Sequence, residues 1–274
     1  MYSVFGDESH EGRANRVYLI AGLFGDEDEW RKTRSAWTDL TNGEDFHAGD
    51  WWHAKRFSEY SRLCDVICNS QLIGFSVAMD MKDYDQIFES AVPQLPYYFC
   101  FGRVIEKFAE VASTCLPVDK VEFTFDRNFD VQYNATFMYD YMIKLPEWEH
   151  SELLADKVSF ATRKDAGIQM ADLVARETMR WLDNLATGYS RPRSRCFANL
   201  FESKKLIYHV FEKSYFESLK GRLAEFVKEG HEMTKYHEWR KSNRMQDTTE
   251  NRLRFHIQLD ILQRQREAKT SGKG

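Results

Sequence analysis

Four acidic side chains stand at the ends of apolar runs or within one. Asp7 and Glu8 follow SVFG near the start of the chain, Asp126 follows EFTF, and Asp172 lies within IQMADLVA. Clustered carboxylates raise one another's pKa, and hard divalent cations bind oxygen clusters of this kind. Two such ions about 4 Å apart can activate water and stabilise the leaving oxygen of a phosphodiester. These acids therefore indicate metal-dependent hydrolysis, and the alternative is that Asp7 and Glu8 begin a solvated turn.

The position of Asp172 can be examined on its predicted helix. Asp165, Gln169, Asp172 and Arg176 are spaced by four, three and four residues, so they share one stripe. The apolar stripe beside it would pack on a sheet, which places Asp172 next to the buried face. Asp172 and Arg176 could instead form a surface ion pair worth a few tenths of a kcal/mol.

The elements that must position these acids follow from the apolar patterning. Strands are predicted over 2–7, 16–24, 72–79, 120–126 and 157–161, and the polar connection 10–15 predicts a hairpin between the first two. Helices are predicted over 26–40, with Asp26 as the cap, and over 57–69, 95–116, 131–143 and 166–185. Residues 44–53 are expected to be irregular, and residues 208–226 to be mixed, with helix from Tyr215. The pattern predicts an α/β protein with a mixed sheet flanked by helices.

Four segments resemble the bacterial and phage family catalogued as domain of unknown function 3800. They are FGDES at 5–9, FHAGDWW at 46–52, FTFDRN at 123–128 and VSFATRKDAGIQMADLVA at 158–175. The resemblance implies a ribonuclease H-like fold in which Asp7, Asp126 and Asp172 bind Mg²⁺ or Mn²⁺ and Glu8 is a fourth carboxylate. The company this family keeps suggests phage defence or mobile-element biology.

The chain departs from the family pattern at two places. His10 stands where relatives usually have glycine after DES, and Arg163-Lys164 stands where many relatives have Ser-Lys. The first change affects loop freedom rather than chemistry, and the second keeps the positive charge.

Several further residues are candidates for substrate binding. His47 could orient a phosphate or transfer a proton, or it could be a structural histidine. Lys164 precedes the helix that carries Asp172, and Gln169 lies on that helix. Arg191 and Arg193 lie in a basic loop that could bind a nucleic-acid backbone or be ordinary surface. The only tryptophans considered for base stacking are Trp51 and Trp52; Cys64 and Cys68 are expected in the core.

Composition limits the function classes. The 274 residues carry a net charge of −5, so the whole chain is not a basic nucleic-acid binder. From residue 231 onward, 10 Lys and Arg stand against 6 Asp and Glu. The five cysteines form no CxxC pair, nothing resembles a signal peptide, and no run is long enough to span a bilayer, so we expect a reducing, cytoplasmic compartment.

The sequence thus predicts three regions. Residues 1–187 form the ribonuclease H-like core, 188–230 a helical elaboration of it, and 231–274 a polar, basic C-terminal helix and tail. The leading hypothesis is a metal-dependent nuclease acting on DNA or RNA. The alternative is a non-catalytic subunit that binds nucleic acid or a partner, and a protein partner or homodimer is compatible with either.

Overall fold

The computed structural model describes residues 1–10, 16–88, 95–115, 120–144, 148–188, 194–203, 205–219, 238 and 241–242. The helices and strands named below lie in one unit, Met1–Lys220. The strands are β1 (Tyr2–His10), β2 (Val17–Asp26), β3 (Ile73–Asp80), β4 (Val121–Asp126), β5 (Ser159–Ala161) and β6 (Leu206–Phe211). The helices are α1 (Glu27–Thr41), α2 (Ala48–His53), α3 (Phe57–Asn69), α4 (Met81–Phe88), α5 (Leu95–Ser113), α6 (Gln132–Ile143), α7 (Ala166–Ala186), α8 (Arg195–Glu202) and α9 (Lys213–Leu219), with a 3₁₀ turn η1 (Ser151–Leu153).

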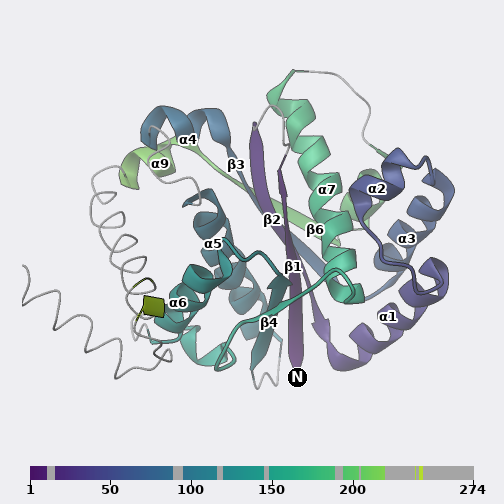
Figure 1. Cartoon of the computed structure of the whole chain (residues 1–274), viewed down its shortest axis with the longest axis horizontal. Coiled ribbons are helices and arrows are strands. Elements are labelled where there is room, and N and C mark those ends of the chain that lie inside the picture. Colours follow the sequence, from purple (N-terminus) through teal and green to yellow (C-terminus); the bar gives the residue numbers. More distant parts are fainter. Residues whose placement is uncertain are drawn as a thin grey trace, which may run out of the picture. The chain divides into compact units, whose positions relative to one another are not determined.

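The strands form one mixed sheet in the order β5-β4-β1-β2-β3-β6 (Figure 1). The pairs β1/β2 and β2/β3 are antiparallel, whereas β4 is parallel to β1 and β5 to β4. Helices cover both faces. The face covered by α7, with α1, α3 and α8 beside it, is called the α7 face, and the face covered by α5 is called the α5 face (Figure 1). The predicted mixed sheet flanked by helices is confirmed.

Most predicted elements agree with the structure to within a few residues, but three differ. β1 continues to His10, because its residues pair with β2 along their whole length. The segment predicted as irregular contains the six-residue helix α2, which the burial of Trp51 in the core holds in place. The C-terminal elaboration is not purely helical: LIYHVF forms β6, which extends the sheet parallel to β3.

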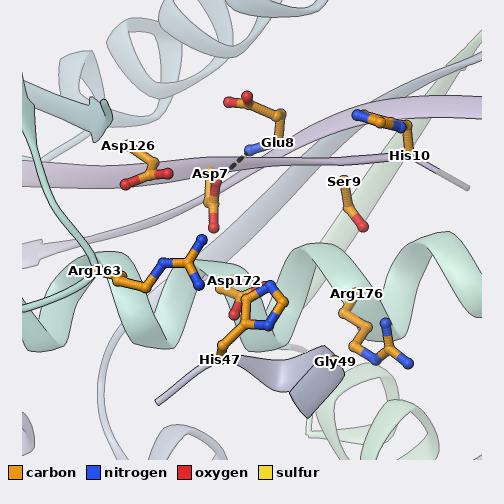
Figure 2. A pocket seen from close by; sticks show the side chains of 10 residues that line it. All are labelled: Asp7, Glu8, Ser9, His10, His47, Gly49, Asp126, Arg163, Asp172 and Arg176. Carbon is orange, nitrogen blue, oxygen red and sulfur yellow. Dashed lines mark hydrogen bonds between the residues drawn. The ribbon is translucent and has the colours of Figure 1, made fainter. Parts of the chain in front are cut away.

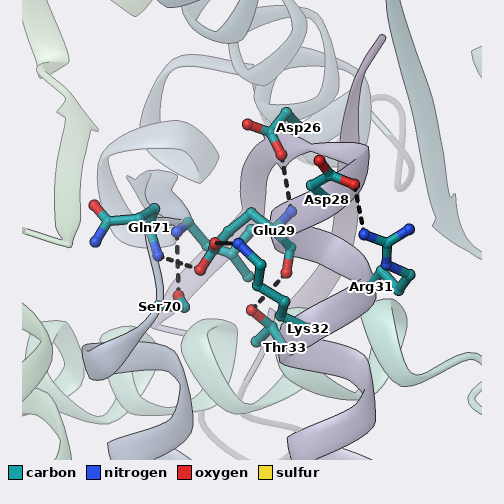
Figure 3. A network of polar contacts seen from close by, with 9 residues as sticks. Asp26, Asp28, Glu29, Arg31, Lys32, Thr33, Ser70 and Gln71 are labelled. Carbon is teal, nitrogen blue, oxygen red and sulfur yellow. Dashed lines mark hydrogen bonds and ion pairs between the residues drawn. The ribbon is translucent and has the colours of Figure 1, made fainter.

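Helix α1 begins where its sequence predicts. The Asp26 carboxylate accepts a hydrogen bond from Glu29 N at 2.8 Å, and three acids in the first turn favour the positive end of the helix dipole. Glu29 Oε1 also accepts from Gln71 N, which ties α1 to the segment before β3 (Figure 3). Trp30 and Trp37 are buried, as their helical spacing predicts.

Helix α7 lies directly on the sheet because a glycine allows close approach. Asp165 caps the helix by accepting from Gly167 N at 2.7 Å. A Cβ on Gly167 would stand 2.5 Å from Cγ of Phe5 on β1. The Phe5 ring has little room to move, since the Trp30 ring lies edge-on at 4.7 Å and the Arg34 guanidinium lies 4.4 Å over it.

We expect Gly167→Ala to lower the free energy of unfolding by about 1–3 kcal/mol, because the methyl group overpacks a fixed aromatic ring. The matched control is Gly102→Ala on α5, where the new Cβ would meet only the flexible Met138 side-chain end, at 2.5 Å. Urea unfolding of both variants tests this. Equal effects in the two variants would show that the α7–β1 contact is not a tight one.

Candidate functional site

Strand register places Asp7 and Asp126 side by side. The parallel pairing of β1 with β4 runs from Tyr2↔Val121 to Gly6↔Phe125. The next position on each strand is an aspartate, Asp7 on β1 and Asp126 at the end of β4. Neighbouring strands lie about 4.8 Å apart, so this register alone makes the two acids neighbours.

Helix α7 supplies the third aspartate. Asp172 lies in the second turn of α7, on the side that faces β1 below Asp7 (Figure 2). Its Oδ2 accepts a hydrogen bond from Ala48 N at 2.7 Å, at the first residue of α2. The short helix that the sequence did not predict therefore fixes one oxygen of a candidate ligand.

Glu8 points away from Asp7, because successive side chains of a strand face opposite sides of the sheet. Asp7 faces α7, whereas Glu8 faces the other way (Figure 2). Glu8 Oε1 accepts from Asn128 Nδ2 at 2.8 Å, in the loop after β4. Adjacent acids in the sequence thus have different surroundings in the fold.

These acids line a single polar pocket of about 340 Å³. Its lining consists of Asp7, Glu8, Ser9, His10, His47, Gly49, Asp126, Arg163, Asp172 and Arg176 (Figure 2). The size is at the lower end of the range for small-ligand sites. All four acids predicted from the sequence are therefore brought together.

The electrostatics of the pocket follow from burial and like charge. Asp7 keeps some accessible surface, yet its removal from bulk water raises its pKa well above 3.8, and the charges of Asp172, Glu8 and Asp126 raise it further. Burial also raises the pKa of Asp172, opposed by the hydrogen bond from Ala48. A carboxylate in such surroundings is stabilised by a nearby cation.

The pKa values of the other two acids are raised as well. Burial is the main cause for Asp126, and the backbone N–H of Arg127 and the charge of Arg163 oppose it. Burial raises the pKa of Glu8, and the hydrogen bond from Asn128 opposes it. All four acids thus have pKa values raised by the same cause.

The donor set fits a hard divalent cation, because it consists of carboxylates whose ionisation the pocket disfavours. Among the described residues, however, no group of three or more His, Cys, Asp or Glu is already placed to hold a metal ion. Binding an ion would therefore require these carboxylates to move closer together, and Asp172 could use the oxygen that does not accept from Ala48 N.

The predicted substrate-binding residues have different positions. His47 lines the pocket, and its Nδ1 lies 3.0 Å from Asp50 Oδ2, without hydrogen-bond geometry. Lys164 is exposed and does not line the pocket, whereas its neighbour Arg163 does. Arg191 and Arg193 lie outside the described residues.

Gln169 has a structural role rather than the predicted substrate contact. It is buried, its Oε1 accepts from Trp37 Nε1 at 2.8 Å, and its Nε2 donates to Arg163 O at 2.7 Å. Gln169 therefore joins α1, α7 and the loop before α7. The sequence placed it on the stripe of Asp172, but a stripe on one helix does not show which neighbouring elements cover it.

Trp51 and Trp52 are not free for base stacking. The Arg56 guanidinium covers the Trp51 ring at 3.5 Å, and the Arg180 guanidinium covers the Trp52 ring at 3.8 Å. Cys64 is buried and Cys68 half-buried, and both are free thiols in or beside the core, as expected.

The pocket is also lined by residues that sequence reasoning did not name as site residues: Ser9, His10, Gly49, Arg163 and Arg176. Arg176 was considered only as a surface partner of Asp172. Its one-turn spacing from Asp172 was the signal that could have placed it in the site.

The fold and site define an α/β protein with a mixed sheet, in which β1–β3 are antiparallel, β4 is parallel to β1 and β5 to β4, and carboxylates lie where β1, β4 and α7 meet. A search of solved structures finds ribonuclease HII of Archaeoglobus fulgidus in its PCNA complex, at 14% identity and TM-score 0.44, covering 76% of this chain and 92% of that one. It also finds Bst ribonuclease HIII in complex with Mn²⁺, at 11% identity and TM-score 0.44, covering 75% of this chain and 63% of that one.

At these identities and TM-scores, the similarities assign no activity to this chain. No protein-family model and no curated protein sequence matches the chain. Within the described residues, no helix is both long and apolar enough to cross a membrane.

We expect the metal-free protein to lose stability as the pH rises, because the native state holds the Asp7 proton more tightly than the unfolded chain does. The loss begins near the ordinary aspartate pKa and ends above the raised pKa of Asp7, and within that window it amounts to about 1.4 kcal/mol for each pH unit. Asp7→Asn removes this contribution. In EDTA at neutral pH, the variant should therefore be more stable than the wild type.

Urea unfolding from about pH 4 to about pH 8 checks the sign and the window. Asp39→Asn, on the exposed side of α1, is the control for the loss of one carboxylate. If the free energies of unfolding of the two variants differed from that of the wild type equally at every pH, the fold would not disfavour the ionised form of Asp7.

Proposed function

We propose that this protein is a divalent-metal-dependent nuclease that hydrolyses phosphodiester bonds of DNA or RNA. The observation that carries the proposal is the β1/β4 register, which sets Asp7 beside Asp126 with Asp172 facing them from α7. This register and the position of α7 bring together acids from three separate segments of the sequence, at a place where their charges repel.

The chain's own residues have distinct roles in this proposal. Asp7, Asp126 and Asp172 would hold Mg²⁺ or Mn²⁺, with Glu8 as a fourth carboxylate. When bound, the ion would lower the pKa of a water molecule and neutralise charge on the phosphate. The Ala48 N–H orients Asp172, and Asn128 orients Glu8.

The basic side chains of the pocket support a phosphate-containing substrate. His47 and Arg163 both line it, and Arg163 lies close enough to Asp126 and Asp172 to lower their pKa values. A polyanion approaching four carboxylates requires such positive charge beside them. A neutral sugar substrate would not need it.

We further propose membership of the domain of unknown function 3800 family. The DES segment contributes Asp7 and Glu8 to the pocket, and the Q-x-A-D-L segment contributes Asp172, with Gln169 holding the helix in place. Motif residues with these two kinds of role support a shared site.

Asp7→Asn and Asp172→Asn should each lower Mn²⁺-dependent cleavage of DNA or RNA by about a hundredfold or more, because each removes a charged ligand. Asparagine keeps an oxygen that can accept from Ala48 N, so Asp172→Asn should stay folded. Gel assays with single- and double-stranded DNA and RNA measure cleavage, and calorimetry measures Mn²⁺ binding. Asp39→Asn is the control.

Full activity in both variants would exclude this site. Nucleic-acid binding that is insensitive to chelator, with no cleavage of any substrate, would support the non-catalytic subunit instead.

A further inference from the structure

The pocket continues past the aspartates toward one end. Ser9 and His10 on β1, Arg176 on α7, and Gly49 on α2 surround this end, whereas Asp126 and Arg163 lie at the opposite end (Figure 2). The aspartates account for only part of the lining. We call the part around Ser9 and Arg176 the distal end.

Helix α7 and strand β1 each place a residue at the distal end, at a similar distance from their aspartates. Arg176 lies one helical turn after Asp172, a rise of about 6 Å along α7. Ser9 lies two residues after Asp7, about 6.6 Å along β1 on the same side of the strand. Both steps run in the same direction (Figure 2). A step of this length is comparable to the distance between adjacent phosphates of one nucleic-acid strand.

Arg176 has hydrogen-bonding capacity that the described protein does not use. Its Nε is buried and has no hydrogen-bond partner. No carboxylate in the described ranges lies within ion-pair distance of its guanidinium, although the charge of Arg176 acts to lower the pKa of Asp172. By contrast, Arg180, one turn further along α7, pairs with Glu177 at 3.0 Å and covers Trp52.

Gly49 makes room for Arg176 at the distal end. A Cβ on Gly49 would stand 3.5 Å from Arg176 Nη1 and 3.1 Å from Cε1 of His47. A Cβ there would crowd the His47 ring, and a longer side chain would extend from a position already in contact with the Arg176 guanidinium. The absence of a side chain leaves the guanidinium open to the pocket.

We propose that Arg176, assisted by the Ser9 hydroxyl, binds the phosphate adjacent to the scissile phosphate. A guanidinium can donate two parallel hydrogen bonds to phosphate oxygens, and a hydroxyl can donate a third. The substrate is then a polynucleotide strand with at least two consecutive phosphates, not an isolated phosphodiester. This inference rests on the proposed nuclease function and adds the substrate class to it.

The test uses the full chain and Arg176→Gln, Arg176→Lys and Arg62→Gln, the last being an exposed arginine on α3 outside the pocket. The first measurement is fluorescence anisotropy of a fluorescein-labelled single-stranded oligonucleotide in EDTA at several salt concentrations. The second is Mn²⁺-dependent cleavage of a dinucleoside monophosphate and of the trinucleotide that carries one further phosphate.

Arg176→Gln should weaken oligonucleotide binding about tenfold and lower the salt slope by about one phosphate contact. Arg176→Lys should keep the salt slope of the wild type and part of its affinity, because lysine keeps the positive charge but cannot donate two parallel hydrogen bonds. Arg62→Gln should match the wild type. The wild type should prefer the trinucleotide through a lower KM, and Arg176→Gln should lose that preference.

The outcomes separate the two proposals. Cleavage with unchanged binding and slope in Arg176→Gln overturns the distal phosphate site and leaves the nuclease standing. Binding that depends on Arg176 without any cleavage supports the site and overturns the nuclease. No binding by the wild type overturns the site, whatever the cleavage assay shows.

Discussion

The register between β1 and β4 is the constraint on which the site depends. Pairing ends at Gly6↔Phe125, so the next residues, Asp7 and Asp126, become neighbours with no freedom to separate by sliding. A shift of one residue would turn Asp7 to the other face of the sheet. This register requires glycine at position 6, because a Cβ there would lie 2.7 Å from the Phe125 ring. Buried side chains such as Val4 and Phe123 hold the two strands in this register. The packing of the core therefore offsets the repulsion between the neighbouring Asp7 and Asp126 carboxylates.

Helix α7 has to be placed as accurately as the strands, and its first turns show how. Asp165 caps the helix and accepts from Arg34 at 3.1 Å, while Gln169 is hydrogen-bonded to Trp37 and to the Arg163 carbonyl. The bonds to Arg34 and Trp37 run to α1 and the bond to the Arg163 carbonyl runs to the preceding loop, so together they fix the rotation of α7 about its axis. Asp172, one turn after Gln169, inherits that rotation. The motif around Asp172 thus contains its own positioning residues, and this explains why Gln169 is buried rather than facing the pocket.

The sequence predicted the elements well but not the relations between them. Apolar runs and the Asp26 cap were sufficient to find β1 through β5 and most of the helices, because these signals are local. The juxtaposition of Asp7 and Asp126 could be anticipated only as a shared edge, since register between strands far apart in the sequence has no local signal. Lys164 was preferred to Arg163 for the same reason: neighbouring residues of one loop point in different directions, and only the fold decides which faces the pocket. Helix α2 and strand β6 were missed because each depends on packing against distant elements.

The alternation of β1 explains why the chain tolerates two adjacent acids inside a strand. Asp7 faces α7 and Glu8 faces the other side, so the two carboxylates point away from each other, although the charge of Glu8 still raises the pKa of Asp7. Asp126, at the end of β4, raises the pKa of both, and it is therefore the carboxylate common to the two sides. Asn128, two residues later, donates to Glu8 and holds it at the pocket. The last residue of β4 thus supplies an acid beside Asp7, and the loop after β4 supplies an amide to Glu8. The end of β4 is therefore the place where the two faces of the sheet meet in one site.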